Sequence, residues 1–341
     1  MGRLEDLLGL DHPIVLGPFG AGMSSVALTA AVSDAGGLGS YGGNALPPDR
    51  LTDLVAELKA ATSRSFAVNL WVPQPEEQDA VATEADVERL RPYYDALGLT
   101  PPTLVPPLDF ADQAAALLAA EPPAISFVMG VPPADVLAQA RRKGIVTIGT
   151  ATTVDEAIAL DEAGLDVVVA SGSDAGGHRG AFLRPARESL VGTFSLVPQV
   201  ADKVSAPVVA AGGIADRRGV VAALALGADG VQVGTGFLVT EESAVGEAHL
   251  RALLGEEAKV TVLTRLFSGR TARAIPNAFV REMAGFEDAV PPYPVQNQLM
   301  LPIRRAGGAD HINLWSGQAA PLVRRRKAAE YLADLAGLTG E

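Results

Sequence analysis

The residues best suited to chemistry lie at 171–180, in the sequence SGSDAGGHRG. This loop follows an apolar run at 166–170, whose β-branched residues predict a strand buried on both faces. Glycines let the loop backbone approach a ligand closely, and His178 is a single imidazole that can exchange a proton near neutral pH, with Asp174 close by in the sequence. We therefore predict that His178 is catalytic, the alternatives being a histidine packed in the core or exposed on a loop.

Glycines also follow two later apolar runs. Gly212 and Gly213 come after residues 207–211, and Gly234 and Thr235 come after residues 230–233. Each pair is expected to open a helix, where backbone N–H groups suit a phosphate, so phosphate binding is favoured over ordinary turns.

Two polar residues at the ends of other predicted strands are harder to interpret. Asn69 could cap a turn or bind the polar edge of a heterocycle, and the sequence does not choose between these roles. Thr150 has the same two interpretations.

Several other chemistries are disfavoured. The chain has no cysteine, which excludes disulfides, thiolate metal sites and a cysteine nucleophile. His12, His249 and His311 lack metal-ligand spacing, and no serine has a G-x-S-x-G context. The glycines of the G-x-G-x-x-G sequence at 37–42 begin inside a predicted strand, which argues against a dinucleotide fingerprint.

Composition limits the partners. The 341 residues carry a formal net charge of −13, which disfavours nucleic acid. The sequence shows no signal peptide and no apolar run of the roughly 20 residues that span a bilayer. A cytoplasmic protein without membrane contact is therefore expected.

Short apolar runs alternate with amphipathic segments, a pattern that predicts a (β/α)₈ barrel. Helix start signals occur at Ser24-Ser25, Asp49 and Thr152-Thr153, with a capping box expected over residues 153–156, and Gly36, Gly144, Gly164 and Gly227 fit helix C-termini. The predicted strands are residues 13–16, 37–41, 66–70, 124–128, 145–149, 166–170, 207–211 and 230–233. The predicted helices are residues 24–35, 49–61, 110–120, 134–143, 154–163 and 216–226.

We expect three parts along the chain. Residues 1–240 would form the barrel, with the proline-rich insertion at 72–107 passing over its mouth. Residues 241–310 would form a smaller helical substrate or cap domain, and residues 311–341 would return to the barrel. The glycine-rich loops directly follow three of the predicted barrel strands. They therefore lie at the C-terminal ends of the strands, where barrel enzymes carry their catalytic residues.

Six segments resemble the nitronate monooxygenase family, formerly called 2-nitropropane dioxygenases: residues 13–43, 66–71, 171–180, 207–216, 226–238 and 314–318. The resemblance implies an α/β TIM barrel with FMN at its mouth and His178 as the catalytic histidine. It places the flavin against Gly22, Met23, Asn69, Thr150, Ser171, Gly172, Gly176 and Gly177, and the phosphate at Gly212, Gly213, Gly234 and Thr235. One departure is Gly236, where many relatives have arginine.

The activity implied by the resemblance is FMN-dependent oxidation of alkyl nitronates, such as propionate 3-nitronate, or of nitroalkanes. Dioxygen would be consumed, and a carbonyl compound and nitrite released. His178 would act as base or orienting group, roles that suit an imidazole with a near-neutral pKa.

Two alternatives stay open: an FMN-dependent NAD(P)H reductase of the enoyl-ACP or quinone type, and more remotely a non-redox enzyme with a phosphate-bearing ligand. The sequence also leaves open the substrate, the roles of the cap residues Tyr293, Gln296 and Gln298, and the oligomeric state, a homodimer included.

Overall fold

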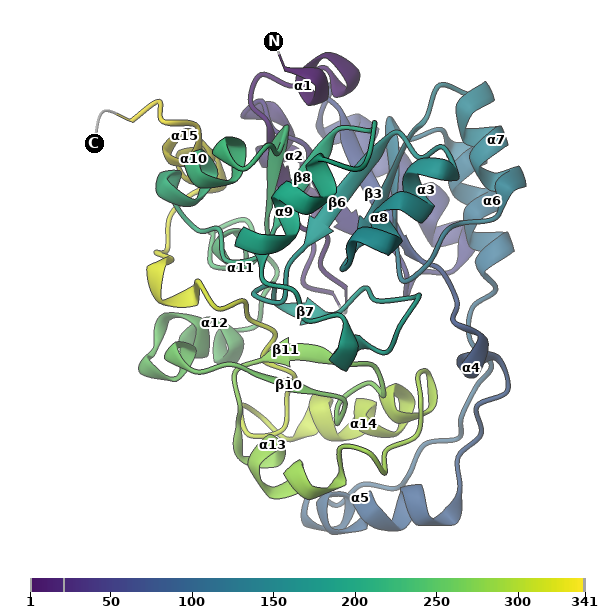
Figure 1. Cartoon of the computed structure of the whole chain (residues 1–341). Helices are drawn as coiled ribbons and strands as arrows, with labels where there is room; N and C mark the ends of the chain where they lie inside the picture. The colour runs from purple at the N-terminus through teal and green to yellow at the C-terminus, as the bar shows by residue number, and fades with distance from the viewer. Residues whose placement is uncertain (1, 21, 340–341) are drawn as a thin grey trace.

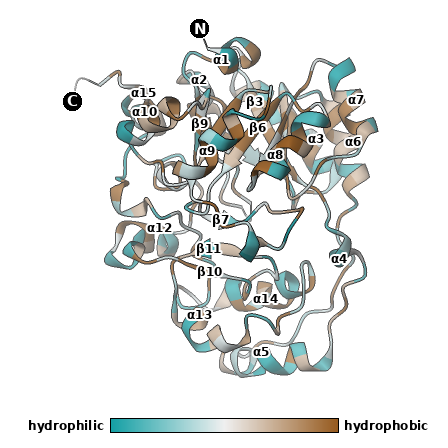
Figure 2. Cartoon of the chain, viewed as in Figure 1, coloured by the Kyte–Doolittle hydropathy of each residue, from teal (hydrophilic) through white to brown (hydrophobic). Residues whose placement is uncertain are grey.

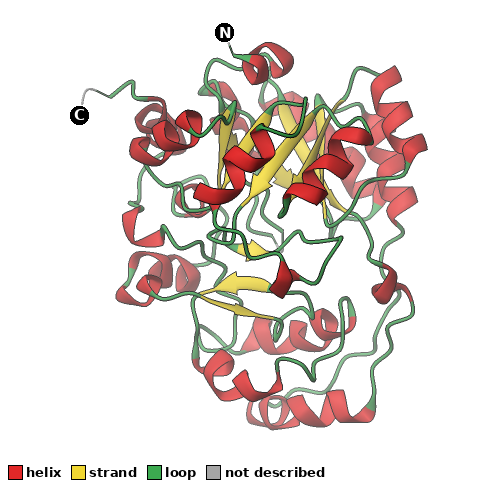
Figure 3. Ribbon diagram, in the orientation of Figure 1, coloured by secondary structure: helices red, strands yellow, loops and turns green. Residues whose placement is uncertain are grey.

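Eight parallel strands form the wall of a barrel, as the sequence predicted (Figures 1 and 3). The structure is a computed structural model that describes residues 2–20 and 22–339. Neighbours follow the order β1-β9-β8-β6-β5-β4-β3-β2, and a bridge between Val15 and Leu38 joins the two ends of the sheet. The strands are β1 (Ile14–Leu16), β2 (Gly39–Gly42), β3 (Phe66–Trp71), β4 (Ala124–Val128), β5 (Val146–Ala151), β6 (Val167–Ser171), β8 (Val208–Ala211) and β9 (Gly230–Val233).

Strand β6 shows why the barrel strands are apolar throughout. Side chains alternate across a strand, so Val167 and Val169 pack in the cluster that fills the barrel, while Val168 and Ala170 pack against the outer helices. The strands accordingly form the most hydrophobic part of the chain in Figure 2. The surrounding helices are α1 (Arg3–Leu8), α2 (Val26–Asp34), α3 (Pro48–Ala61), α6 (Phe110–Ala120), α7 (Ala134–Arg142), α8 (Val154–Glu162), α9 (Thr193–Ala201), α10 (Arg217–Ala225) and α15 (Ala328–Ala336).

The predicted helix ends are mostly confirmed. Ser25 accepts a hydrogen bond from the Leu28 N–H at 2.9 Å, and Thr153 accepts one from the Glu156 N–H at 3.3 Å. The four glycines predicted at helix C-termini all have φ between 68° and 98°, where a side chain would be strained. Asp49 is not a cap, because α3 already begins at Pro48.

The capping box expected at 153–156 is incomplete, because the Glu156 carboxylate turns away from the Thr153 N–H. It accepts hydrogen bonds from the Thr152 N–H at 2.6 Å and from the Phe182 N–H at 2.7 Å. Glu156 thus ties the start of α8 to the chain that follows the 171–180 loop.

A second lobe lies beyond the barrel mouth, and it is not purely helical as the sequence suggested. Strands β10 (Val262–Thr264) and β11 (Ala272–Ala274) join β7 (Gly177–His178) in a sheet of order β10-β11-β7. The term second lobe means this three-stranded sheet together with the helices α5, α13 and α14, whose bounds follow. The remaining α-helices are α4 (Pro75–Gln78), α5 (Glu84–Ala96), α11 (Thr235–Leu238), α12 (Glu247–Leu254), α13 (Ala278–Met283) and α14 (Val295–Ala306).

The insertion after β3 completes the core of the second lobe. Leu90 and Tyr94 of α5 pack with Phe267, Phe279 and Leu299 in one buried cluster. The Tyr94 hydroxyl donates to the Leu299 carbonyl at 2.5 Å. Figure 1 shows α5 beside α13 and α14, far from the barrel strands. The insertion therefore extends past the barrel mouth that it was expected to cover.

The C-terminal helix α15 packs on the barrel against α2 and α10. Among the described residues, no helix combines the length and apolar character that crossing a bilayer would require.

Candidate active site

His178 lies where the barrel meets the second lobe. Backbone pairing sets His178 opposite Ala272 of β11, so the second lobe holds the loop that follows β6. The imidazole Nε2 is 2.9 Å from the Ser268 hydroxyl oxygen. Its ring centroid is 4.8 Å from that of Trp71 and 5.1 Å from that of Trp315. Three distant parts of the chain thus surround one imidazole.

The environment of His178 disfavours its charged form. Desolvation, reinforced by the positive charges of Arg270 and Arg304, lowers the pKa of His178 to about 3. The ring is therefore neutral at physiological pH, and the near-neutral pKa expected from the sequence is wrong. Asp174 is not among the charges that shift the pKa of His178, and its carboxylate instead accepts a hydrogen bond from the Thr193 N–H at 2.8 Å. Ser268 is compatible with a neutral ring, since a hydroxyl can donate or accept.

Arg304 is an unusual cation in this region. It lies on α14 and donates to the Asn297 side-chain oxygen at 2.9 Å and to the Asn297 carbonyl at 3.0 Å. Its Nε is buried without a hydrogen-bond partner among the described residues. Because its partners are neutral, its charge stays uncompensated and acts on His178 and on the Tyr293 hydroxyl.

The glycines predicted to bind a cofactor form a tight cradle at the ends of β6 and β8. Gly212 and Gly213 have φ of 110° and 70°. A Cβ on Gly212 would lie 2.8 Å from the Ala175 nitrogen, and one on Gly176 would collide with the Gly317 nitrogen. Only glycine allows these backbones to approach so closely.

Residues 316–318 complete this cradle, a role that the sequence analysis did not assign. The Gly317 N–H donates to the Thr235 hydroxyl at 2.9 Å, and the Gln318 N–H donates to the Asp174 carbonyl at 3.0 Å. The sequence did indicate this region, because residues 314–318, which include Gly317, form one of the six segments that carry the family resemblance.

The β8 loop differs from its prediction in one respect. Gly212 and Gly213 do not open a helix directly, since α10 begins at Arg217 and is capped by Asp216, which accepts from the Arg218 N–H at 3.0 Å. A phosphate at this loop would meet loop backbone rather than the start of α10. After β9 the prediction is confirmed, because α11 begins at Thr235 directly after Gly234.

Most of the other predicted cofactor residues lie at the carboxyl ends of barrel strands or in the loops that follow them, whereas Gly177 lies in the second sheet. The buried Asn69 amide donates to the Ser126 hydroxyl at 3.0 Å and to the Ser126 carbonyl at 3.2 Å, which fixes its orientation. Met23 packs between the barrel core and the second lobe. The remaining members of this group are Gly22, in the loop after β1, Thr150 in β5, Ser171 at the end of β6, Gly172, and Gly177 in β7.

Gly236 faces the outer helix layer. A Cβ at this position would collide with the Tyr331 hydroxyl of α15, which donates to the Ala215 carbonyl at 2.7 Å. The Tyr331 side chain therefore fills the space that a side chain at position 236 would need.

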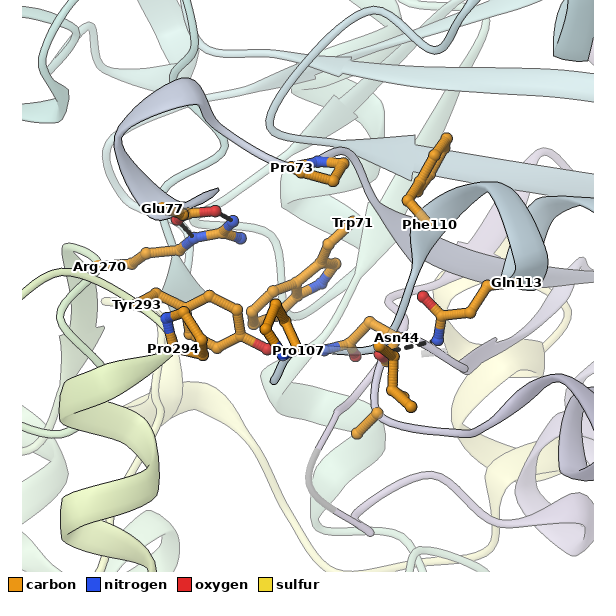
Figure 4. A pocket seen from close by; sticks show the side chains of 12 residues that line it. Asn44, Trp71, Pro73, Glu77, Pro107, Phe110, Gln113, Arg270, Tyr293 and Pro294 are labelled. Atoms are coloured by element: carbon orange, nitrogen blue, oxygen red, sulfur yellow. Dashed lines mark hydrogen bonds and ion pairs between the residues drawn. The ribbon is translucent and has the colours of Figure 1, made fainter. Parts of the chain in front are cut away.

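A cavity of about 140 Å³ lies beside Trp71 (Figure 4). Tyr293 lines it, as the sequence suggested for a cap residue. Gln296 and Gln298 do not: their amides donate to the Leu266 carbonyl at 2.6 Å and to the Val105 carbonyl at 2.8 Å. The lining residues are Asn44, Ala45, Trp71, Pro73, Glu77, Pro107, Leu108, Phe110, Gln113, Arg270, Tyr293 and Pro294.

Known proteins share this arrangement. The family model for nitronate monooxygenase matches residues 2–336. A probable nitronate monooxygenase of Staphylococcus aureus (strain Newman) is 39% identical over 340 residues, covering 98% of this chain and 96% of the relative. The structure of nitroalkane oxidase from Streptomyces ansochromogenes matches with 37% identity and a TM-score of 0.91, covering 98% of this chain and 96% of that one. FabK from Thermotoga maritima matches with 30% identity and a TM-score of 0.77, covering 98% and 94%. By sequence and by structure, the chain belongs to the nitronate monooxygenase family of oxidoreductases.

Proposed function

We propose that this enzyme uses bound FMN and dioxygen to oxidise alkyl nitronates to a carbonyl compound and nitrite. The observation that carries the proposal is the position of the His178 imidazole, which packs against Trp71 and Trp315 beside the glycine cradle, in surroundings that lower its pKa. The family membership supports the reaction class, and the nitroalkane oxidase similarity supports a nitro compound as substrate.

The residues present fit FMN. A Cβ on Gly176 or Gly212 would collide with neighbouring backbone, and Gly213 has a φ of 70°, so these close-packed loops need glycine. Glycine-rich loops of this kind present backbone N–H groups, which suit a phosphate. The oriented Asn69 amide would meet the polar edge of the flavin, with Gly22, Met23, Thr150, Ser171, Gly172 and Gly177 around it, and Gly234 and Thr235 would complete the phosphate site. FMN would supply the two-electron acceptor that is reoxidised by dioxygen.

His178 suits a substrate that is already an anion. A general base works best with a pKa near the working pH, and an imidazole whose pKa is about 3 is a weak base toward the C–H of a neutral nitroalkane. A neutral imidazole can still orient a nitronate through a hydrogen bond. The charge of Arg304, whose hydrogen-bond partners are neutral, disfavours imidazolium and favours an anion at the same place.

The test is anaerobic mixing of the FMN-loaded enzyme with a nitronate, NADH or NADPH, followed by flavin absorbance. We expect rapid bleaching by the nitronate, then nitrite formation when oxygen is admitted. Bleaching by NADH or NADPH but not by the nitronate would instead support a reductase, the alternative with which the FabK similarity is compatible.

A variant pair tests the role of His178. His178→Asn should keep FMN but lose most of kcat/KM for the nitronate. His311→Asn is the matched control, because His311 lies in the loop after α14, where it packs against Tyr93 and bonds the Gly307 carbonyl. Unchanged turnover in His178→Asn would contradict the assignment.

A further inference from the structure

The cavity beside Trp71 is mostly apolar, and the Trp71 indole separates it from His178. The indole of Trp71 lines the cavity and also contacts the His178 ring at 4.8 Å between centroids. The Tyr293 ring lies 5.5 Å from that of Trp71, centroid to centroid, and three prolines, Leu108 and Phe110 add further apolar surface to the wall. A substrate body in this cavity would therefore lie against the same indole that meets His178.

Arg270 is the one basic residue in the cavity wall, among the residues that the structure describes. Its guanidinium forms a two-point ion pair with the Glu77 carboxylate, and the two side chains are only 10% and 8% exposed. The guanidinium carbon lies 4.9 Å from the Trp71 ring centroid and 4.5 Å from that of Tyr293. Figure 4 shows the pair at the edge of the cavity, next to these rings.

Glu77 therefore determines whether the cavity wall attracts an anionic group of the substrate. A paired guanidinium offers little attraction to a second carboxylate, and a carboxylate without a partner pays a large desolvation cost in an apolar cavity. Without Glu77, Arg270 would present an uncompensated charge between two aromatic faces.

We propose that the cavity holds the uncharged hydrocarbon body of the substrate and that Glu77, by neutralising Arg270, excludes a carboxylate from it. This inference rests on the proposed function and narrows its substrate class to nitronates with an apolar chain or ring. A cavity of about 140 Å³ is similar to apolar cavities that accept benzene, so it suits a body of roughly six carbons.

The experiment compares kcat/KM for the nitronate of 1-nitrohexane with kcat/KM for propionate 3-nitronate. The FMN-loaded wild type should prefer the hexyl substrate, and Glu77→Gln should shift the ratio at least about tenfold toward propionate 3-nitronate, because close buried charge pairs are typically worth that much or more. A glutamine keeps an acceptor for the Gln74 N–H, which Glu77 binds at 3.1 Å. Glu76→Gln changes an exposed neighbour on the same helix and should leave the ratio unchanged.

A double variant guards against a loss of folding. Glu77→Gln with Arg270→Gln makes the wall neutral again and should restore the preference for the hexyl substrate. Wild-type preference for propionate 3-nitronate, or an unchanged ratio in Glu77→Gln that folds as the wild type does, would overturn the inference.

A binding assay separates this inference from the proposed function. Tryptophan fluorescence should respond saturably to 1-hexanol in the wild type, and to succinate only in Glu77→Gln. If this pattern holds while neither nitronate is oxidised, the cavity assignment stands and the proposed function fails. If both nitronates are oxidised but the expected responses to 1-hexanol and succinate are absent, the cavity assignment fails and the proposed function stands.

Discussion

The depressed pKa of His178 makes a quantitative prediction about stability. Its native pKa, about 3, lies below the ordinary value of 6.5, so below pH 6.5 the unfolded state binds more protons than the native state. Stability should therefore fall as the pH falls from 6.5 toward 3. Between pH 7 and pH 5, linkage gives a loss of at most about 2 kcal/mol from this one group, less the screening that a partly accessible ring receives.

Urea unfolding of the FMN-loaded wild type and of His178→Asn at pH 7 and pH 5 measures this loss. The wild type should lose more stability than His178→Asn, by roughly 1–2 kcal/mol, and His311→Asn should behave as the wild type. Comparing the variants removes the contribution of His249, whose pKa is also lowered by desolvation. The chain has four histidines, so NMR can follow each ring directly. A His178 resonance that titrates near pH 6.5, or equal stability losses in wild type and His178→Asn, would refute the reasoning.

Three further predictions concern the cradle, the Asn69 amide and Arg304. Gly176→Ala should lower the free energy of unfolding by about 1–3 kcal/mol and weaken FMN retention, because the methyl group would collide with the Gly317 backbone. Thermal unfolding measures this loss. Gly246→Ala is the control, because a Cβ at Gly246 meets nothing within 4 Å. Asn69→Ala should weaken FMN binding about tenfold, the value of one hydrogen bond, and Ser126→Ala, which removes only one partner of the amide, should do less in the same equilibrium titration. Arg304→Gln should raise the pKa of His178, because it removes one of the charges that disfavour imidazolium; an NMR titration midpoint that does not rise would contradict this.

The barrel was predictable because its signals are local. Strands β4 and β9 and helix α6 begin and end at the predicted residues, since buried strands and capped amphipathic helices show in short windows of sequence. The glycine cradle was predictable for the same reason, apart from Gly317, whose partner Thr235 is distant in the chain.

The features that the sequence did not reveal depend on long-range contacts. Strands β10 and β11 have three residues each, too few to show an alternating pattern. The pKa of His178 depends on Arg270 and Arg304, whose closeness no spacing indicates. The cavity wall likewise combines segments around residues 44, 73, 107, 270 and 293.

The divided origin of the second lobe has a consequence for biosynthesis. Tyr94 and its hydrogen-bond partner Leu299 are 205 residues apart, and most of the barrel lies between them. At about 5–20 residues per second, a ribosome needs roughly 10–40 s to make that stretch. Until the chain from Phe267 to Leu299 has emerged, the core that buries Leu90 and Tyr94 is incomplete, so these side chains stay available to chaperones. A fragment limited to residues 241–310 would lack both side chains, so this lobe cannot be moved between proteins as one continuous cassette.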